Sequence, residues 1–172
     1  MKSSRVASLL MVAIATIGVW ASEGEPKLDY ALKDQFGTSH TDEDCGEAVV
    51  ILFGGDRKGS TYIDEWSPTL HHSLGPKLEE GTVCSVGFAH LKGAPFFVKK
   101  KIVASFPKEP DAWILLDWKG EIAKKWGAGK DAANLYIFDR GGELVYSVSL
   151  REFDQGAFDR IVDVVNDSVA EQ

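Results

Sequence analysis

The sequence has few of the residues and motifs on which enzyme chemistry usually depends. It contains only two cysteines and four histidines among its 172 residues. The Gly-x-Ser-x-Gly element of serine hydrolases and the His-Glu-x-x-His element of zinc peptidases are both absent. His71 and His72 are adjacent in a predicted helix, where their side chains point about 100° apart, and His40 and His90 are isolated in the sequence. We therefore predict no metal site and no cofactor.

The chain also lacks the positive charge that nucleic-acid-binding proteins carry. Its 26 acidic residues outnumber its 19 Lys and Arg residues, which gives a formal net charge of −7. This balance argues against nucleic acid and against an anionic membrane as partners. We interpret the densest basic run, residues 99–101, as one solvated face of a helix. No linker, repeat or low-complexity tract divides the chain, so its length and composition indicate one globular domain.

The first 21 residues have the pattern of a secretory signal peptide. Lys2 and Arg5 are followed by an apolar run that ends in the tripeptide Val-Trp-Ala at 19–21, which suits cleavage after a small residue. The alternative is an uncleaved membrane anchor, but the run is short for a bilayer span of about 20 residues. Removing Lys2 and Arg5 takes the net charge from −7 to −9. We expect a mature domain over 22–172, periplasmic or secreted, with no membrane insertion after cleavage.

Export would place the two cysteines in an oxidising compartment, where a structural disulfide is the default for a pair. Cys45 lies just before one predicted core strand and Cys84 lies near the start of the next, so the two can be neighbours. A disulfide that closes a loop of this length would stabilise the fold by roughly 4 kcal/mol. Two free thiols and a redox-active pair remain alternatives. The redox alternative needs a thiolate of lowered pKa, and Glu43, Asp44 and Glu47 surround Cys45 with the wrong charge for it.

Short apolar strands alternate with helical segments along the mature chain. The run Val49 to Phe53 is typical of a strand covered on both faces. It leads through a Gly-rich turn into a helix that we expect Ser60 or Thr61 to cap and the pair Gly75-Pro76 to stop near Leu74. The other predicted strands lie at 28–32, 38–41, 82–89, 113–116, 134–138 and 144–150, and the other helices at 96–106, at 121–126 and after the cap Asp154. Helix crossovers between apolar strands imply a parallel core, so we predict an α/β sandwich.

The order of these elements resembles that of thioredoxin-like proteins, in particular peroxiredoxins and periplasmic thiol–disulfide oxidoreductases. Three stretches carry the resemblance: the entry hairpin and first core strand LKDQFGTSHTDEDCGEAVVILF, the middle strand and short helix WILLDWKGEIAKKWGA, and the closing hairpin NLYIFDRGGELVYSV. The stretch APFFVKKKIVASFPKEPDAWILLDWKG is similar to YtfJ-type periplasmic proteins. The resemblance implies a thioredoxin-like three-layer sandwich over most of 28–168, in which a mixed sheet has a parallel core and antiparallel edge hairpins.

The cysteines that give this family its activity are missing at the matching positions. Aligned on the helix proline Pro68, the two family cysteines fall at Ser60 and Ile63. Aligned on the end of the preceding strand, they fall near Lys58 and Thr61. The resemblance therefore implies a degenerate active-site loop made of Gly54, Gly55, Asp56, Arg57, Lys58, Gly59, Ser60 and Ile63.

The cis-proline that faces the dithiol in this family is missing as well. The matching position is Ala133, and no proline follows Pro110. A cis bond before a residue other than proline costs about 2.5–4 kcal/mol. We therefore expect a trans peptide at Ala133 and a reshaped site.

These absences favour a non-catalytic binding or accessory protein of the periplasm. Its partner would be an unknown protein or a small anion, bound by the loop Gly54 to Ser60 and the turn before Asn134. Backbone N–H groups with Arg57 and Lys58 at a helix N-terminus would suit an anion. The alternative is a thiol–disulfide oxidoreductase or a peroxiredoxin-like antioxidant enzyme that uses the chain's only two cysteines, at 45 and 84.

Overall fold

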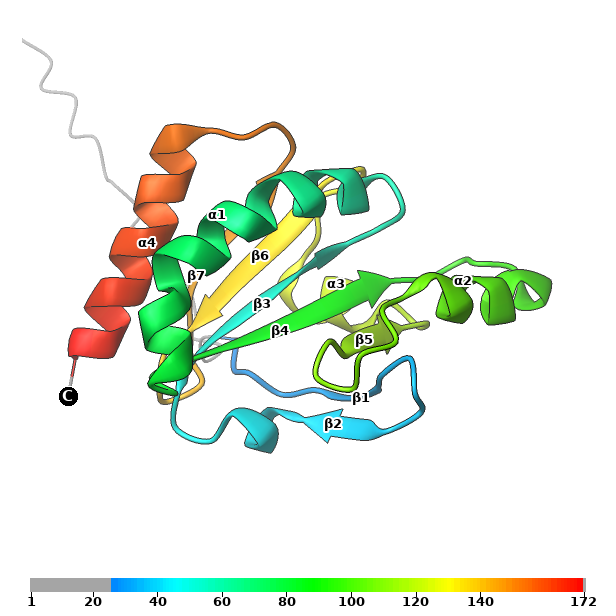
Figure 1. Ribbon diagram of the computed structural model, residues 1–172, viewed down its shortest axis with the longest axis horizontal. Coiled ribbons are helices and arrows are strands. Elements are labelled where there is room, and N and C mark those ends of the chain that lie inside the picture. Colours follow the sequence, from blue (N-terminus) through cyan, green and yellow to red (C-terminus); the bar gives the residue numbers. More distant parts are fainter. Residues whose placement is uncertain (1–25, 172) are drawn as a thin grey trace, which may run out of the picture.

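A computed structural model describes residues 26–171 of the chain (Figure 1). The signal peptide predicted over 1–21 lies outside these residues. Within 26–171 no helix combines the length and the apolar character that crossing a membrane requires.

A five-stranded mixed sheet forms the centre of the fold (Figure 1). Its strands, in spatial order, are β5 (Ile114–Asp117), β4 (Val83–His90), β3 (Val49–Gly55), β6 (Ala133–Phe138) and β7 (Leu144–Leu150). The first three are parallel, β6 is antiparallel to β3, and β7 is antiparallel to β6. The predicted parallel core with a closing antiparallel hairpin is therefore confirmed.

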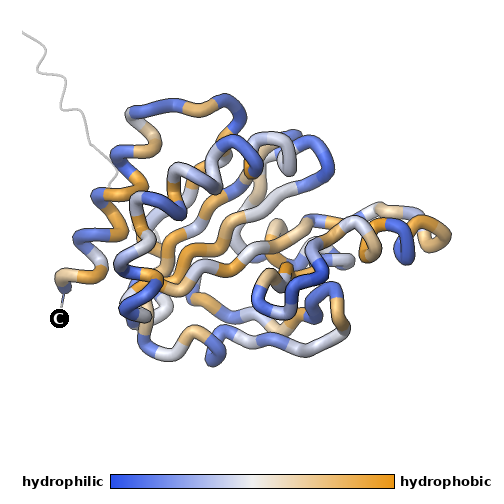
Figure 2. The backbone as a smooth tube through the Cα atoms, viewed as in Figure 1, coloured by the Kyte–Doolittle hydropathy of each residue, from blue (hydrophilic) through white to orange (hydrophobic). Residues whose placement is uncertain are grey.

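Helices cover both faces of this sheet and complete the predicted three layers. The helices α1 (Gly59–Glu79) and α4 (Gln155–Ala170) lie on one face, and the short α3 (Glu121–Trp126) lies on the other. Figure 2 shows hydrophobic residues concentrated along the strands between these layers. Successive residues of β3 face opposite sides, because Val49 and Ile51 join the cluster under α1 and α4 while Val50 and Leu52 join the cluster with α3. This double coverage explains the continuous apolar run of β3.

The N-terminal hairpin forms a small sheet of its own instead of an edge of the central sheet. Its strands are β1 (Ala31–Lys33) and β2 (Ser39–Thr41), and they pair only with each other among the described strands. A 3₁₀ turn, η1 (Asp42–Cys45), then leads into β3. The predicted antiparallel hairpin is confirmed, but the prediction that it lies on the edge of the main sheet is wrong.

The helix α1 continues five residues beyond the predicted end at Leu74, so the expected stop at Gly75-Pro76 is wrong. Both Pro68 and Pro76 lie inside the helix. Trp66, Leu70 and Leu74 follow one another at helical spacing and are all buried against the sheet. This burial along one face of the helix outweighs the hydrogen bonds that the two prolines cannot make.

The crossover from β4 to β5 holds a 3₁₀ turn, η2 (Phe96–Val98), and the short helix α2 (Lys99–Ser105). The sequence predicts a single helix over 96–106 here. None of the residues of η2 or α2 is buried, and Figure 1 shows this segment projecting beyond the sheet.

The close approach of the α1 N-terminus to the segment before β6 predicts an unusual response to a helix substitution. A Cβ atom added to Gly59 would lie 2.1 Å from the carbonyl oxygen of Ala132, whereas one added to Gly75 meets nothing within 4 Å. Replacing a helix glycine with alanine normally stabilises by about 0.5–1 kcal/mol. We expect this gain for Gly75→Ala and a loss of about 1–3 kcal/mol for Gly59→Ala, because the backbone must move apart.

Urea unfolding of the two variants measures this difference. A stabilising Gly59→Ala would contradict the contact with Ala132.

Candidate functional site

The loop between β3 and α1 is held closed by the carboxylate of Asp56. One carboxylate oxygen accepts hydrogen bonds from the backbone N–H groups of Lys58 (3.0 Å) and Gly59 (2.8 Å). The other accepts from the N–H of Asp131 (3.0 Å). The backbone carbonyl of Asp56 accepts from the N–H of Ser60 (2.9 Å). One side chain thus joins the start of α1 to the segment before β6.

Asp56, and not Ser60 or Thr61, satisfies the first N–H groups of α1, so the predicted caps are wrong. The hydroxyls of Ser60 and Thr61 instead donate to the carbonyls of Arg57 (2.9 Å) and Lys58 (2.8 Å). The N–H groups of residues 58 to 61 all have acceptors within the chain. This helix N-terminus therefore does not offer those donors to a small anion.

The hydrogen bonds also set the protonation of Asp56. Partial burial alone would raise its pKa, but the N–H groups of Gly59, Asp131 and Lys58, helped by the nearby His90, outweigh burial and lower the pKa below its ordinary value. Asp56 is therefore ionised at neutral pH, where it acts as an acceptor for the loop.

The segment before β6, which holds Ala133, lies directly against this loop. Ala133 pairs with Gly55 in the antiparallel register of β3 and β6. Two residues earlier, Asp131 adopts a left-handed backbone with φ of +54°, and its carboxylate lies 3.2 Å from the Nζ of Lys58. All peptide bonds of residues 26–171 are trans. The structure thus brings Ala133 beside the loop that the sequence analysis singled out.

The other loop residues differ in their exposure. Gly54 leaves no room for a side chain, because a Cβ atom would lie 1.9 Å from the carbonyl oxygen of Phe88. Arg57, Lys58 and Ser60 are exposed, whereas Ile63 packs against the core under α1 and α4. The polar part of the loop is therefore available at the surface, and Ile63 is half-buried against the core.

A second polar pair, which the sequence analysis did not predict, lies at the same edge of the sheet. His90 ends β4, Asp117 ends β5, and the two are opposite each other in the parallel register. Asp117 is fully buried and accepts hydrogen bonds from the N–H groups of Glu121 (2.7 Å) and Ile122 (3.1 Å) at the start of α3. The Nδ1 of His90 lies 3.7 Å from its carboxylate. The signal was present in the sequence, because both residues directly follow apolar runs predicted as neighbouring parallel strands.

The two cysteines form a disulfide at the opposite end of the sheet. Cys45 in η1 is bonded to Cys84 in β4, with their Cα atoms 5.7 Å apart. Cys84 pairs in register with Val50, near the start of β3. Because a strand rises about 3.3 Å per residue, Asp56 lies about 20 Å further along. The disulfide and the β3–α1 loop are therefore separate features.

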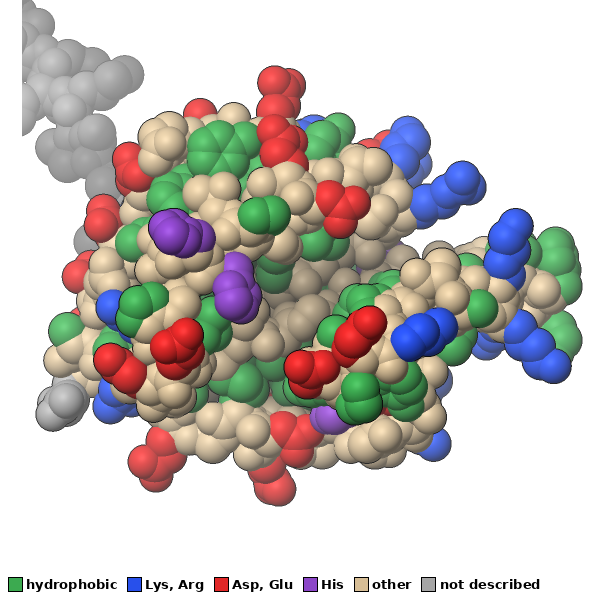
Figure 3. Space-filling model, in the orientation of Figure 1, with side chains coloured by type: hydrophobic (Ala, Val, Ile, Leu, Met, Phe, Trp, Pro, Cys, Tyr) green, Lys and Arg blue, Asp and Glu red, His purple; other side chains and the backbone are tan. Residues whose placement is uncertain are grey.

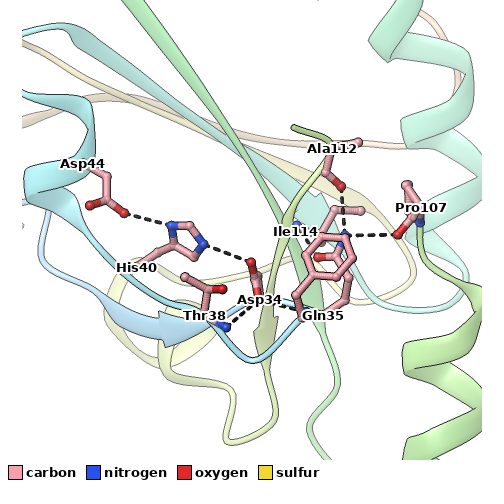
Figure 4. Close-up of polar contacts among 9 residues, drawn as sticks. Asp34, Gln35, Thr38, His40, Asp44, Pro107, Ala112 and Ile114 are labelled. Atoms are coloured by element: carbon pink, nitrogen blue, oxygen red, sulfur yellow. Dashed lines mark hydrogen bonds and ion pairs between the residues drawn. The ribbon is translucent and has the colours of Figure 1, made fainter. Parts of the chain in front are cut away.

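The hairpin holds a third polar cluster, drawn in Figure 4. The His40 ring lies between the carboxylates of Asp34 (3.1 Å) and Asp44 (2.8 Å) and stacks on Trp113 with ring centres 4.0 Å apart. His40 stands alone in the sequence, so its partners depend on the hairpin pairing. Within the described part of the chain no group of three or more His, Cys, Asp or Glu residues is arranged to hold a metal ion.

Comparison with known proteins identifies the fold. No family model and no curated protein sequence matches the chain. Among solved structures, the Chlorobium tepidum protein described as thiol:disulfide interchange protein DsbE superposes with a TM-score of 0.63 at 18% identity, over 85% of this chain and 97% of its own.

Two further solved structures have the same fold. BsSco, a member of the Sco family of cytochrome c oxidase assembly proteins, gives a TM-score of 0.61 at 16% identity, over 86% of this chain and 96% of its own. An exposed lipoprotein thioredoxin of Streptococcus pneumoniae gives a TM-score of 0.60 at 13% identity, over 79% of this chain and 98% of its own. The chain thus has a thioredoxin-like fold, and its structural neighbours include thiol:disulfide interchange proteins.

The lowered pKa of Asp56 predicts how its contribution to stability depends on pH. A carboxylate whose folded pKa lies below its unfolded value of about 3.9 stabilises the fold above that value, and the effect is lost as the pH falls through the folded pKa. Asp56→Asn should therefore cost about 1–2 kcal/mol at pH 7. The difference from the parent chain should shrink below pH 4.

Urea unfolding at pH 7 and pH 3 tests this dependence, with the exposed Asp64→Asn on α1 as the matched control. If Asp56→Asn lowered the free energy of unfolding by the same amount at pH 7 and pH 3, the lowered pKa assigned to Asp56 would be contradicted.

Proposed function

We propose that this chain is an exported, thioredoxin-like binding or accessory protein that does not catalyse thiol–disulfide exchange. Its binding surface is the edge formed by the β3–α1 loop and the segment before β6. The observation that carries the proposal is that a carboxylate network, centred on Asp56, occupies the β3–α1 loop, where the family resemblance would place the dithiol. The two cysteines are bonded to each other about 20 Å away.

The surroundings of the disulfide support a structural role for it. Cys45 and Cys84 both pack against the core cluster on the α3 side of the sheet. The residues next to Cys45 are acidic, which disfavours a thiolate. The bond fastens η1 to β4 and closes a loop with a sequence separation of 39.

The proposed partner is a protein and not a small anion. The N–H groups at the start of α1 already have acceptors, so an anion would have to displace the Asp56 carboxylate. What the loop offers is exposed side chains, Arg57 and Lys58, on a backbone fixed by hydrogen bonds. Such a surface suits the acidic groups of a protein partner. The Sco neighbour, described as belonging to a family of assembly proteins, is a precedent for an assembly role on this fold.

Three observations support an extracytoplasmic location. The N-terminal pattern over 1–21 is that of a signal peptide. One structural neighbour is described as an exposed lipoprotein, and the bonded cysteine pair suits an oxidising compartment.

The competing candidate is thiol–disulfide exchange at Cys45–Cys84, because both cysteines are only partly buried and interchange proteins are among the neighbours. Insulin reduction by the exported protein distinguishes the two candidates. We expect no activity above buffer, and we expect Cys45→Ala/Cys84→Ala to lower the free energy of unfolding by about 2–4 kcal/mol. Insulin reduction that either single cysteine substitution abolishes would establish the enzyme instead.

A gain-of-function variant tests whether the β3–α1 loop matches the family site. Lys58 precedes the first residue of α1 and Thr61 lies one turn later, and both are exposed. Positions three apart at a helix N-terminus suit a redox dithiol, since the helix end lowers the thiol pKa. We expect Lys58→Cys/Thr61→Cys to reduce insulin.

The matched control is Ser60→Cys/Ile63→Cys, the alternative alignment, which should be less active because Ile63 is half-buried against the core. Activity in the control pair alone would show that the alignment on the helix proline is the right one.

A further inference from the structure

The crossover between β4 and β5, residues 91–113, leaves the sheet that it would normally cover. A connection between parallel strands usually packs its helix onto the sheet face. Here η2 and α2 contain no buried residue and project beyond the sheet edge (Figure 1). We call this segment the arm.

The tip of the arm is an exposed apolar knob next to concentrated positive charge. Phe96 and Phe97 are 87% and 83% exposed, the highest values among the exposed large hydrophobic residues. Lys99, Lys100 and Lys101 follow after Val98. Residues 91–108 of the arm hold five lysines, and its two acidic residues, Glu109 and Asp111, lie near its end at β5. Figure 3 shows this arrangement, with hydrophobic side chains at the tip and basic ones behind them. Two adjacent phenylalanines left in water are unfavourable unless something covers them.

The sheet face that the arm fails to cover carries an open apolar groove. It has a volume of about 110 Å³ and lies between α1 and the strands β3 and β4. Its lining includes Phe53, Leu70, Leu74, Leu78 and the exposed Ser85. This volume is well below the roughly 300–1,000 Å³ of small-molecule sites, so it suits one or two inserted side chains.

Acidic residues border this groove. Glu79 and Glu80 directly follow Leu78, and Asp64 lies one helical turn before Ser67; all three are exposed. In Figure 3 acidic side chains lie over α1 on one side of the hollow, and others lie over the segment that leads into β5 on the other side. The groove therefore complements the arm in both respects, since it is apolar where the arm carries phenylalanine and acidic where the arm carries lysine.

The arm is fixed in a position away from its own groove. At its start, the N–H of Leu91 donates to the carbonyl of Asp117 (2.9 Å). At its end, the Gln35 side chain donates to the carbonyls of Pro107 (3.3 Å) and Ala112 (2.9 Å) and accepts from the N–H of residue 114 (2.7 Å), as Figure 4 shows. In between, the Lys99 ammonium lies 4.6 Å from the Trp118 ring centre.

We propose that the knob Phe96–Phe97 of one copy of this chain inserts into the α1–β4 groove of a second copy. The lysines of the arm then face the acidic border of that groove. Reciprocal insertion gives a closed dimer, and one-way insertion gives a chain of copies. This self-association uses surfaces other than the proposed partner-binding loop.

Analytical ultracentrifugation of the exported protein tests the proposal. We expect concentration-dependent self-association, which Phe96→Asp/Phe97→Asp weakens by roughly 100-fold or more. The matched control is Val145→Asp, which changes an exposed hydrophobic residue on β7 and should leave the association unchanged. A parent chain that stays monomeric, or an association that the phenylalanine variant does not alter, would overturn the proposal.

A charge exchange tests the orientation of the two copies. Lys100→Glu/Lys101→Glu should weaken the association, and adding Glu79→Lys/Glu80→Lys to the same chain should restore it. A photo-crosslinker at position 97 should then label residues 64–85 of another copy, identified by mixing isotope-labelled and unlabelled protein. A crosslink elsewhere would overturn the proposed groove as the binding site of the arm. A monomer that binds phosphatidylglycerol vesicles through the phenylalanines would show that the arm binds a membrane surface instead of a second copy.

Discussion

The site depends on one carboxylate, because Asp56 fixes two separate pieces of backbone at once. Its oxygens accept from the start of α1 and from Asp131 before β6. The glycines at 55 and 59 make this possible, since a Cβ atom at either would collide with the carbonyl of Ala132. The edge is therefore a closed surface with a backbone held by hydrogen bonds, and the exposed side chains of Arg57 and Lys58 project from it.

The two ends of the sheet differ in their chemistry. The end where β3 begins carries the disulfide and the acidic turn η1. The other end, where β3, β4 and β5 finish, carries Arg57, Lys58 and the lysines of the arm. Ligands of open α/β sheets bind at the carboxyl ends of the strands. The disulfide lies at the other end of the sheet, where it joins η1 to β4.

The sequence predicts well those elements whose signals are local. α3 and β7 have the predicted boundaries, and Asp154 caps α4 as expected by accepting from the N–H of Ala157. The prediction fails where tertiary packing decides. Burial carries α1 past Pro76, and the cap of α1 comes from Asp56, three residues before the helix begins. The partners of His40 and the outward course of the arm depend on contacts that no local pattern encodes.

The hydrophobic core of the protein does not include the β3–α1 loop. Neither hydrophobic cluster contains any of residues 56–61, and the interior is formed by strands and by helix residues from Tyr62 onward. Residues at the loop can therefore be exchanged at the cost of local hydrogen bonds only, provided that the glycines at 55 and 59 keep the backbones close. Ile63 is the exception among the family positions, because it packs against that core. Changes of side chain at the exposed loop positions therefore leave both hydrophobic clusters in place.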